Sequence, residues 1–138
     1  MLELIHDAAS SDVIEQHGQA LRLAPRLTRP PIYIGGAAAA SLGRTVRYGD
    51  GWMPVGLGPD ELAPHARTLQ TMAREAGRPP LEVVLMKTLP LADPPAAFAM
   101  AQAYADAGVT HLVHTQGVAD ERAFADMVEV LCTTLQSS

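Results

Sequence analysis

The chain has 138 residues, of which 48% are hydrophobic and 18% charged, a composition typical of one globular domain and not of a disordered segment. The formal net charge of -5 gives no basic patch for nucleic acid and disfavours binding to an anionic membrane surface. The single cysteine, Cys132, excludes an internal disulfide framework, and no apolar run approaches the roughly 18 residues that span a bilayer. We therefore expect a cytoplasmic protein with a single domain over residues 1–138.

The first 31 residues lack a regular pattern of strands and helices. Residues 1–10 have the spacing of the end of a helix, with Leu2, Ile5 and Ala9 on one face. Residues 11–31 contain prolines and scattered charges, and we expect them to form a surface connection with little structure. Because a domain that begins inside a helix is unusual, we also expect that a front half precedes this sequence.

From residue 32 onward, short apolar strands alternate with helices. The sequence predicts strands at 32–34, 52–55, 81–89 and 110–114, and helices at 37–48, 59–76, 94–107 and 119–135. This alternation implies an α/β fold with a parallel sheet and right-handed crossovers. Four such units form either a small open sheet or half of an eight-unit barrel, and the period alone does not separate these outcomes.

The apolar residues of each predicted helix indicate which face is buried. The helical period predicts that the following side chains face the core: Leu62, Ala66, Leu69, Ala73 and Ala76 in the second helix, Phe98, Ala101 and Ala105 in the third, and Phe124, Met127, Val128, Leu131 and Leu135 in the last.

Two glycines follow the first predicted strand, in the stretch YIGGAA at 33–38. Gly35 and Gly36 at the carboxyl end of a strand let a ligand approach the backbone, and the next helix presents unpaired N–H groups. Together these features predict a phosphate cradle at Gly35, Gly36 and Ala37. The alternative is that the two glycines only make a tight turn between strand and helix.

The stretch GDGW at 49–52 has two interpretations as well. Locally it is a turn followed by a core tryptophan. On the functional interpretation, Met53, Pro54 and Val55 end the second strand beside the glycine pair, on the rim where ligands bind in parallel α/β folds.

Other reactive side chains give weaker signals. His114, Thr115 and Gln116 end the last strand and could reach a cofactor, although a structural histidine is the more frequent case. No group of residues has the spacing of a metal site, and no residues are identified as catalytic. The helix behind the glycine pair carries Arg44 and Arg47, which we expect on a solvated face.

These residues carry a resemblance to the luciferase-like monooxygenase family. The matching stretches are IEQHG at 14–18, RPPIYIGG at 29–36, YGDGWMP at 48–54, PDEL at 59–62 and AREAGRP at 73–79. The resemblance implies a (β/α)₈ barrel that binds flavin mononucleotide (FMN) or the 8-hydroxy-5-deazaflavin coenzyme at its carboxyl rim. It also implies that Gly35, Gly36 and Ala37 hold the cofactor phosphate, and more loosely Met53, Pro54 and Val55.

The chain departs from that family in length, because one barrel needs roughly 250 residues. We therefore expect the C-terminal half of a flavin- or deazaflavin-dependent oxidoreductase, with part of the phosphate site and no activity alone. One alternative is a non-catalytic half-barrel assembly module, which pairs as a homo-oligomer or with a separate N-terminal half. Another is a small flavodoxin-like nucleotide-binding domain.

Overall fold

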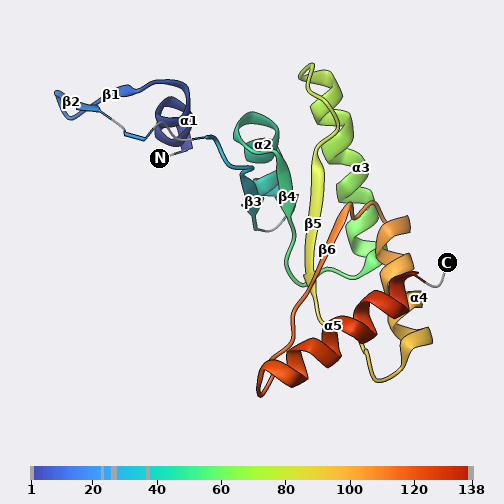
Figure 1. Cartoon of the computed structure of the whole chain (residues 1–138). Coiled ribbons are helices and arrows are strands. Elements are labelled where there is room, and N and C mark those ends of the chain that lie inside the picture. The colour runs from blue at the N-terminus through green and yellow to red at the C-terminus, as the bar shows by residue number, and fades with distance from the viewer. Residues whose placement is uncertain (1, 23, 26–27, 37, 137–138) are drawn as a thin grey trace.

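The computed structural model describes residues 2–22, 24–25, 28–36 and 38–136, and Figure 1 shows their arrangement. The elements in chain order are α1 (Leu2–Ser10), β1 (Val13–Gln16), β2 (Gln19–Arg22), β3 (Tyr33–Gly35), α2 (Ala38–Tyr48), β4 (Gly51–Met53), α3 (Pro59–Glu75), β5 (Glu82–Lys87), α4 (Pro94–Asp106), β6 (His111–His114) and α5 (Glu121–Gln136). Among the described residues, no helix is long and apolar enough to cross a bilayer.

The four strands after residue 32 form one parallel sheet. Its order is β3-β4-β5-β6, so each strand pairs with the next one along the chain. In a flavodoxin-like sheet the first strand lies inside the sheet, between the second and the third. Here β3 lies at the edge, so the flavodoxin-like alternative is wrong. The predicted α/β fold with four parallel βα units is confirmed, in the strand order of half a (β/α)₈ barrel.

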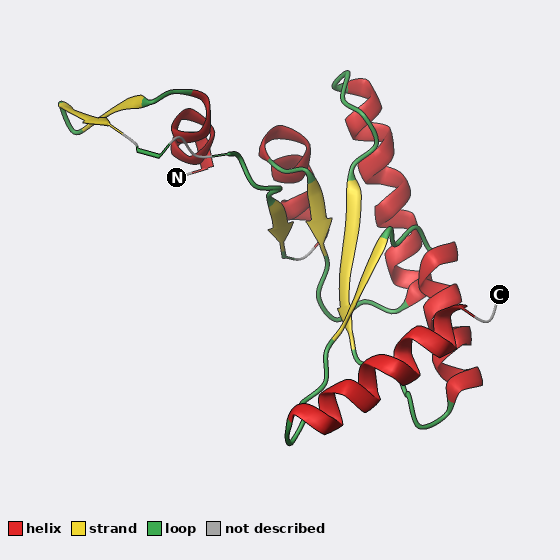
Figure 2. Cartoon of the chain, in the orientation of Figure 1, coloured by secondary structure: helices red, strands yellow, loops and turns green. Residues whose placement is uncertain are grey.

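The helices pack in sequence against the sheet. Contacts join α2 to α3, α3 to α4 and α4 to α5, and Figure 2 shows α3 and α4 on one side of the strands, with α5 crossing below the ends of β5 and β6. The core between the layers includes Trp52, Leu62, Leu69 and Leu85, which are almost completely buried. A consecutive ring of helices around one face of a parallel sheet is the layer arrangement of a barrel wall.

Helix α3 has the ends and the buried face that the sequence predicts. Pro59 occupies the first helical position, and the Glu61 carboxylate accepts a hydrogen bond from the Gly58 N–H at 3.0 Å. Gly77, with φ of +68°, follows the last turn. The four predicted core residues of α3 from Leu62 to Ala73 are buried. Ala76 is exposed because it lies beyond the last turn, at the C-cap.

The predicted face of α4 is wrong in its orientation. Ala97 and Tyr104 are buried, Phe98 and Ala101 are half-buried, and Ala105 is exposed. The helix is apolar around most of its circumference, so the period does not select one face. The hydroxyl of Tyr104 decides the orientation, because it donates to the Leu57 carbonyl at 3.2 Å.

The predicted burial of α5 is also wrong. Phe124, Val128 and Leu135 are 52%, 36% and 42% exposed, while Met127 and Leu131 are half-buried. The helix packs on α4 through its other flank, where Thr134 is buried. Its apolar face therefore remains largely uncovered in the single chain.

The expectation of an irregular connection over residues 11–31 is wrong for β1 and β2. These strands form an antiparallel hairpin in which Gln16 faces Gln19 across a loop of two residues. The loop residues His17 and Gly18 have φ of +53° and +75°, and positive φ at both positions is the requirement of a tight hairpin turn. Because histidine is a less usual residue than asparagine or aspartate at the first position, the sequence signal is weak.

Candidate functional site

The glycine pair lies at the carboxyl end of β3, directly beside the end of β4. Gly35 pairs in register with Met53, and it is exposed. A Cβ atom added to Gly35 would meet only the Met53 carbonyl oxygen, at 3.9 Å, so the fold does not require a glycine there. Gly36 has φ of +121°, a conformation that only glycine adopts without strain. The first glycine thus leaves open space and the second permits the turn.

The peptide carbonyl of Gly36 is held from inside the protein. It accepts hydrogen bonds from the Trp52 indole N–H at 3.3 Å and from the Ser41 hydroxyl at 3.2 Å. Both donors are completely buried, and the Ser41 carbonyl in turn accepts from the Thr45 hydroxyl at 2.9 Å. The buried donors therefore fix the turn that leads from β3 into α2.

The guanidinium group of Arg44 lies beside this turn. Its Nη2 atom is 3.8 Å from the position that a Cβ atom on Gly36 would occupy. Arg44 is exposed, as expected, but its side chain leans back toward the start of α2, as helical side chains do. Within the described part of the chain, no carboxylate forms an ion pair with it. This placement differs from the expected solvated position, and the backward lean of helical side chains could have indicated it from the sequence.

The other predicted rim residues are only partly brought together. Met53 is half-buried next to Gly35, Pro54 is buried, and Val55 is 79% exposed beyond the strand. Ala37 lies outside the described residues. The structure therefore joins Met53 to the glycine pair, while Val55 projects into solvent.

The carboxyl ends of β5 and β6 are tied to each other by His114. Its Nδ1 accepts from the Leu89 N–H at 3.1 Å, so in the neutral ring the proton resides on Nε2. Nε2 in turn donates to Oε1 of Gln116 at 3.1 Å. Both ring nitrogens of His114 are engaged, which favours the structural interpretation over direct acid–base work.

A hollow of about 350 Å³ lies on the same rim, between the ends of β4, β5 and β6. Its lining includes Leu57, Lys87, Thr88 and Thr115. The Thr88 hydroxyl donates to the Thr115 carbonyl at 2.6 Å, so it is engaged within the rim. The Lys87 ammonium lies 5.9 Å from the centre of the Tyr104 ring. The rim thus has space for a ligand but no residue set arranged for proton transfer among the described residues.

The turn before β4 has a structural role at the opposite, amino-terminal end of the strands. The Asp50 carboxylate accepts from the Arg29 guanidinium at 2.9 and 3.0 Å and from the Ile32 N–H at 2.7 Å. Partial burial acts to raise the pKa of Asp50, but the hydrogen bonds from Arg29 and Ile32 outweigh it and lower the pKa below its ordinary value. Asp50 therefore remains ionised and anchors the strand entry.

A polar contact crosses the open face of the sheet at the same end. The Tyr33 hydroxyl donates to the Glu82 carboxylate at 2.6 Å, passing over Gly51 of the intervening strand. A Cβ atom on Gly51 would lie 2.9 Å from the Tyr33 ring and 2.7 Å from the Glu82 carbonyl oxygen. The hydrogen bond to Glu82 and partial burial raise the pKa of Tyr33. Gly51 is therefore required by packing, not by a ligand.

Residues 1–129 match the family described as luciferase-like monooxygenase. This match covers most of the chain. The chain belongs to the luciferase-like monooxygenase family.

A solved structure of an F420-dependent secondary alcohol dehydrogenase, in complex with an F420-acetone adduct, is similar to this chain at 19% sequence identity and a TM-score of 0.48. The similarity covers 99% of this chain and 45% of the dehydrogenase, so this luciferase-like chain spans less than half the length of that enzyme. None of the curated proteins compared with the chain matches it.

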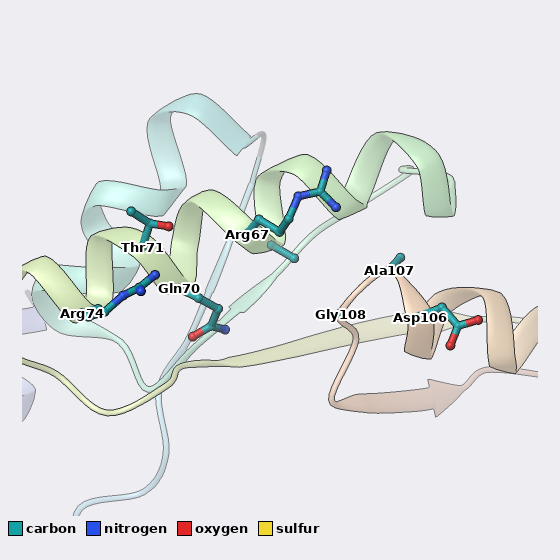
Figure 3. A pocket seen from close by; sticks show the side chains of 8 residues that line it. Arg67, Gln70, Thr71, Arg74, Asp106, Ala107 and Gly108 are labelled. Atoms are coloured by element: carbon teal, nitrogen blue, oxygen red, sulfur yellow. The ribbon is translucent and has the colours of Figure 1, made fainter.

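Other candidate sites in this luciferase-like chain lie away from the rim. A hollow of about 440 Å³ lies on the outer helix layer, between α3 and the end of α4. Figure 3 shows side chains that line it, among them Arg67, Gln70, Arg74 and Asp106. No group of histidine, cysteine, aspartate or glutamate among the described residues can hold a metal ion. Cys132 is exposed on α5.

Proposed function

We propose that this chain supplies the phosphate-binding part of a flavin- or deazaflavin-dependent oxidoreductase, with FMN or the deazaflavin coenzyme as cofactor. The observation that carries the proposal is Gly35. The fold leaves it free to bear a side chain, yet it is a glycine at the carboxyl rim, next to a turn that buried donors hold. A glycine without a packing reason favours close approach of a ligand to the backbone.

The chemistry of the surrounding groups fits a phosphate. The Arg44 guanidinium beside Gly36 supplies a positive charge, and the start of α2 supplies the positive end of a helix dipole. We assign the cofactor phosphate to Gly35, Gly36 and Ala37, with Met53, Pro54 and Val55 on its flank. The bound cofactor supplies the redox chemistry, while this chain orients it through its phosphate.

We expect no turnover by the chain alone. The ring nitrogens of His114 and the hydroxyl of Thr88 are engaged in the rim, so among the described residues no acid–base pair faces the place of a substrate. The purified chain is assayed with reduced FMN and oxygen, and with the deazaflavin and an alcohol. Heat-sensitive turnover above that of the free cofactor would contradict this part of the proposal.

Quenching of flavin fluorescence tests the phosphate site, with FMN and riboflavin as the two probes. Since riboflavin lacks the phosphate, we expect FMN to bind at least about tenfold more tightly, which corresponds to about 1.4 kcal/mol. Arg44→Gln and Gly35→Asp should remove this difference. Arg47→Gln is the matched control, because it makes the same charge change on the same helix, at a residue 3.8 Å from Glu3. Equal affinity for FMN and riboflavin in the wild-type chain would contradict the phosphate site, and the glycine pair would then serve only as the turn between β3 and α2.

Assembly is the second candidate function, and the open edges of the sheet favour it. Among the described residues, strands β3 and β6 each pair on one side only, and between them the uncovered face of the sheet exposes Met86 and Val113. Open edges of this kind pair readily with further strands. A homo-oligomer, or a complex with a separate N-terminal half, would close both edges.

A further inference from the structure

We propose that two copies of this chain close one ring, in which α5 of each copy covers β3 and α2 of the other, and that Gln116 of one copy completes the phosphate site of the other. The assembly stands on the packing of the single chain. The role of Gln116 rests in addition on the phosphate site proposed above.

The uncovered face of α5 is a continuous apolar stripe. Phe124, Val128, Leu131 and Leu135 follow one another at intervals of four, three and four residues, which places them on one side of the helix. Three of them are more than one third exposed. The adjacent flank, which carries the buried Thr134, packs on α4, and the half-buried Leu131 lies at the border between that flank and the exposed part of the stripe.

The chain's own βα units indicate what belongs under this stripe. A crossover helix in a right-handed βα unit covers its own strand and the next one, and α2 contacts both β3 and β4 in this way. Helix α5 follows β6, but in the described sheet no strand lies beyond β6. The stripe therefore marks the position of a further parallel strand.

Strand β3 of a second copy fits that position. It is the other open edge of the sheet, it runs in the same direction as β6, and its own helix α2 would follow α5 as each helix in the chain follows the last. Joining β6 to β3 at both junctions of two copies gives eight strands, the number that closes a parallel barrel with a packed interior.

The charges of the two helices agree with this pairing. Helix α2 carries Arg44 and Arg47 and no carboxylate, and Arg47 already lies 3.8 Å from Glu3 of α1. Helix α5 carries Glu121, Asp126 and Glu129 against the single arginine Arg122. A basic helix thus meets an acidic helix, which favours the contact between unlike surfaces of the two copies.

The same junction brings Gln116 to the glycine pair. Neighbouring strands lie about 4.8 Å apart, so the end of β6 in one copy lies next to the end of β3 in the other. Because Oε1 of Gln116 accepts from His114, its amide nitrogen points away from that ring, and no partner for it lies among the described residues. Two amide N–H donors are therefore held at the rim, where they can donate to a phosphate bound at Gly35 and Gly36 of the second copy.

Sedimentation of the chain at micromolar concentration tests the assembly without any cofactor. We expect a particle of twice the chain mass of 14.6 kDa. Val128→Glu, in the centre of the stripe, should convert it to single chains with unchanged helical circular dichroism. Ala125→Glu adds the same charge to an exposed position beside the stripe on α5 and should leave the dimer intact. A wild-type chain that sediments alone, or a dimer that survives Val128→Glu, overturns the proposed contact; a chain that pairs only with a separate four-unit N-terminal half does so too.

Flavin affinity tests the role of Gln116 separately. Gln116→Leu should weaken FMN binding about tenfold, leave riboflavin binding unchanged and leave the dimer intact, whereas Val128→Glu should weaken FMN binding by dissolving the shared site. Unchanged FMN affinity in a dimeric Gln116→Leu variant overturns the composite site. If FMN and riboflavin bind equally in the wild type, the phosphate site itself fails, and the sedimentation result still decides the assembly.

Discussion

The two ends of the same parallel strands differ in how completely their groups are engaged. At the amino-terminal end, the Asp50 carboxylate has three donors and the Tyr33 hydroxyl reaches Glu82 across Gly51. At the carboxyl end, Gly35 is open, Val55 is exposed and the Arg44 guanidinium has no ion-pair partner among the described residues. The two glycines therefore differ in what surrounds them: neighbouring atoms leave no room for a side chain at Gly51, whereas the surface at Gly35 has room for one.

The largest expected effect is on stability at the packed end. Gly51→Ala places a methyl group within 3 Å of three atoms of Tyr33 and Glu82, and overpacking of this severity costs about 3 kcal/mol. We expect the melting temperature to fall by about 10 °C, measured by circular dichroism. The matched control is Gly35→Ala, which should change the free energy of unfolding by less than about 0.5 kcal/mol because its methyl group makes only an ordinary contact, at 3.9 Å, with the Met53 carbonyl oxygen. Equal losses in the two variants would remove the distinction between the two ends.

A smaller effect is expected at Asp50, with a defined pH dependence. Its folded pKa lies below the ordinary value of 3.8, so its contribution to stability is present above pH 3.8 and is lost as the pH falls through the lowered folded pKa. Because Asp50 and Arg29 are about one third exposed, we expect Asp50→Asn to cost only about 1 kcal/mol near neutral pH. Urea unfolding should show wild type and variant converging at strongly acidic pH. Asp7→Asn removes the same charge at an exposed position of α1 and should leave the free energy of unfolding near neutral pH almost unchanged.

The smallest effect is expected at Tyr33, and it appears at alkaline pH. The hydrogen bond to Glu82 raises the pKa of Tyr33 above 10.0, so the contact stabilises the fold below that pH and is lost as the pH rises through the raised pKa. Tyr33→Phe should remove this alkaline dependence, and Glu82→Gln should bring the tyrosinate absorbance transition of Tyr33 closer to its ordinary range. If Glu82→Gln does not change the tyrosinate transition, the hydrogen bond between Tyr33 and Glu82 does not influence the pKa of Tyr33 in solution.

The sequence predicted the elements of the sheet more accurately than the faces of the helices. Helix α3 has a proline start, a glycine end and an apolar row from Leu62 to Ala73, and all three features act locally. Helix α4 is rich in alanine on every side, so only the Tyr104 contact with Leu57 decides its rotation. Helix α5 has a clear apolar row, but no strand of the described sheet lies beneath it. The helical spacing of apolar residues indicates that a face needs burial, but it does not indicate which other element covers that face.

Local patterns along the chain are sufficient to predict the class of the fold, the glycine pair at a strand end and the luciferase-like monooxygenase family, because strand and helix periods and short motifs are local properties. The three-dimensional packing was needed to learn that β3 lies at the sheet edge, that the Arg44 side chain lies beside Gly36, and that Tyr33 and Glu82 enclose Gly51. These facts depend on contacts between residues up to 49 positions apart in the chain, and such contacts arise from packing the units together, which no local pattern encodes.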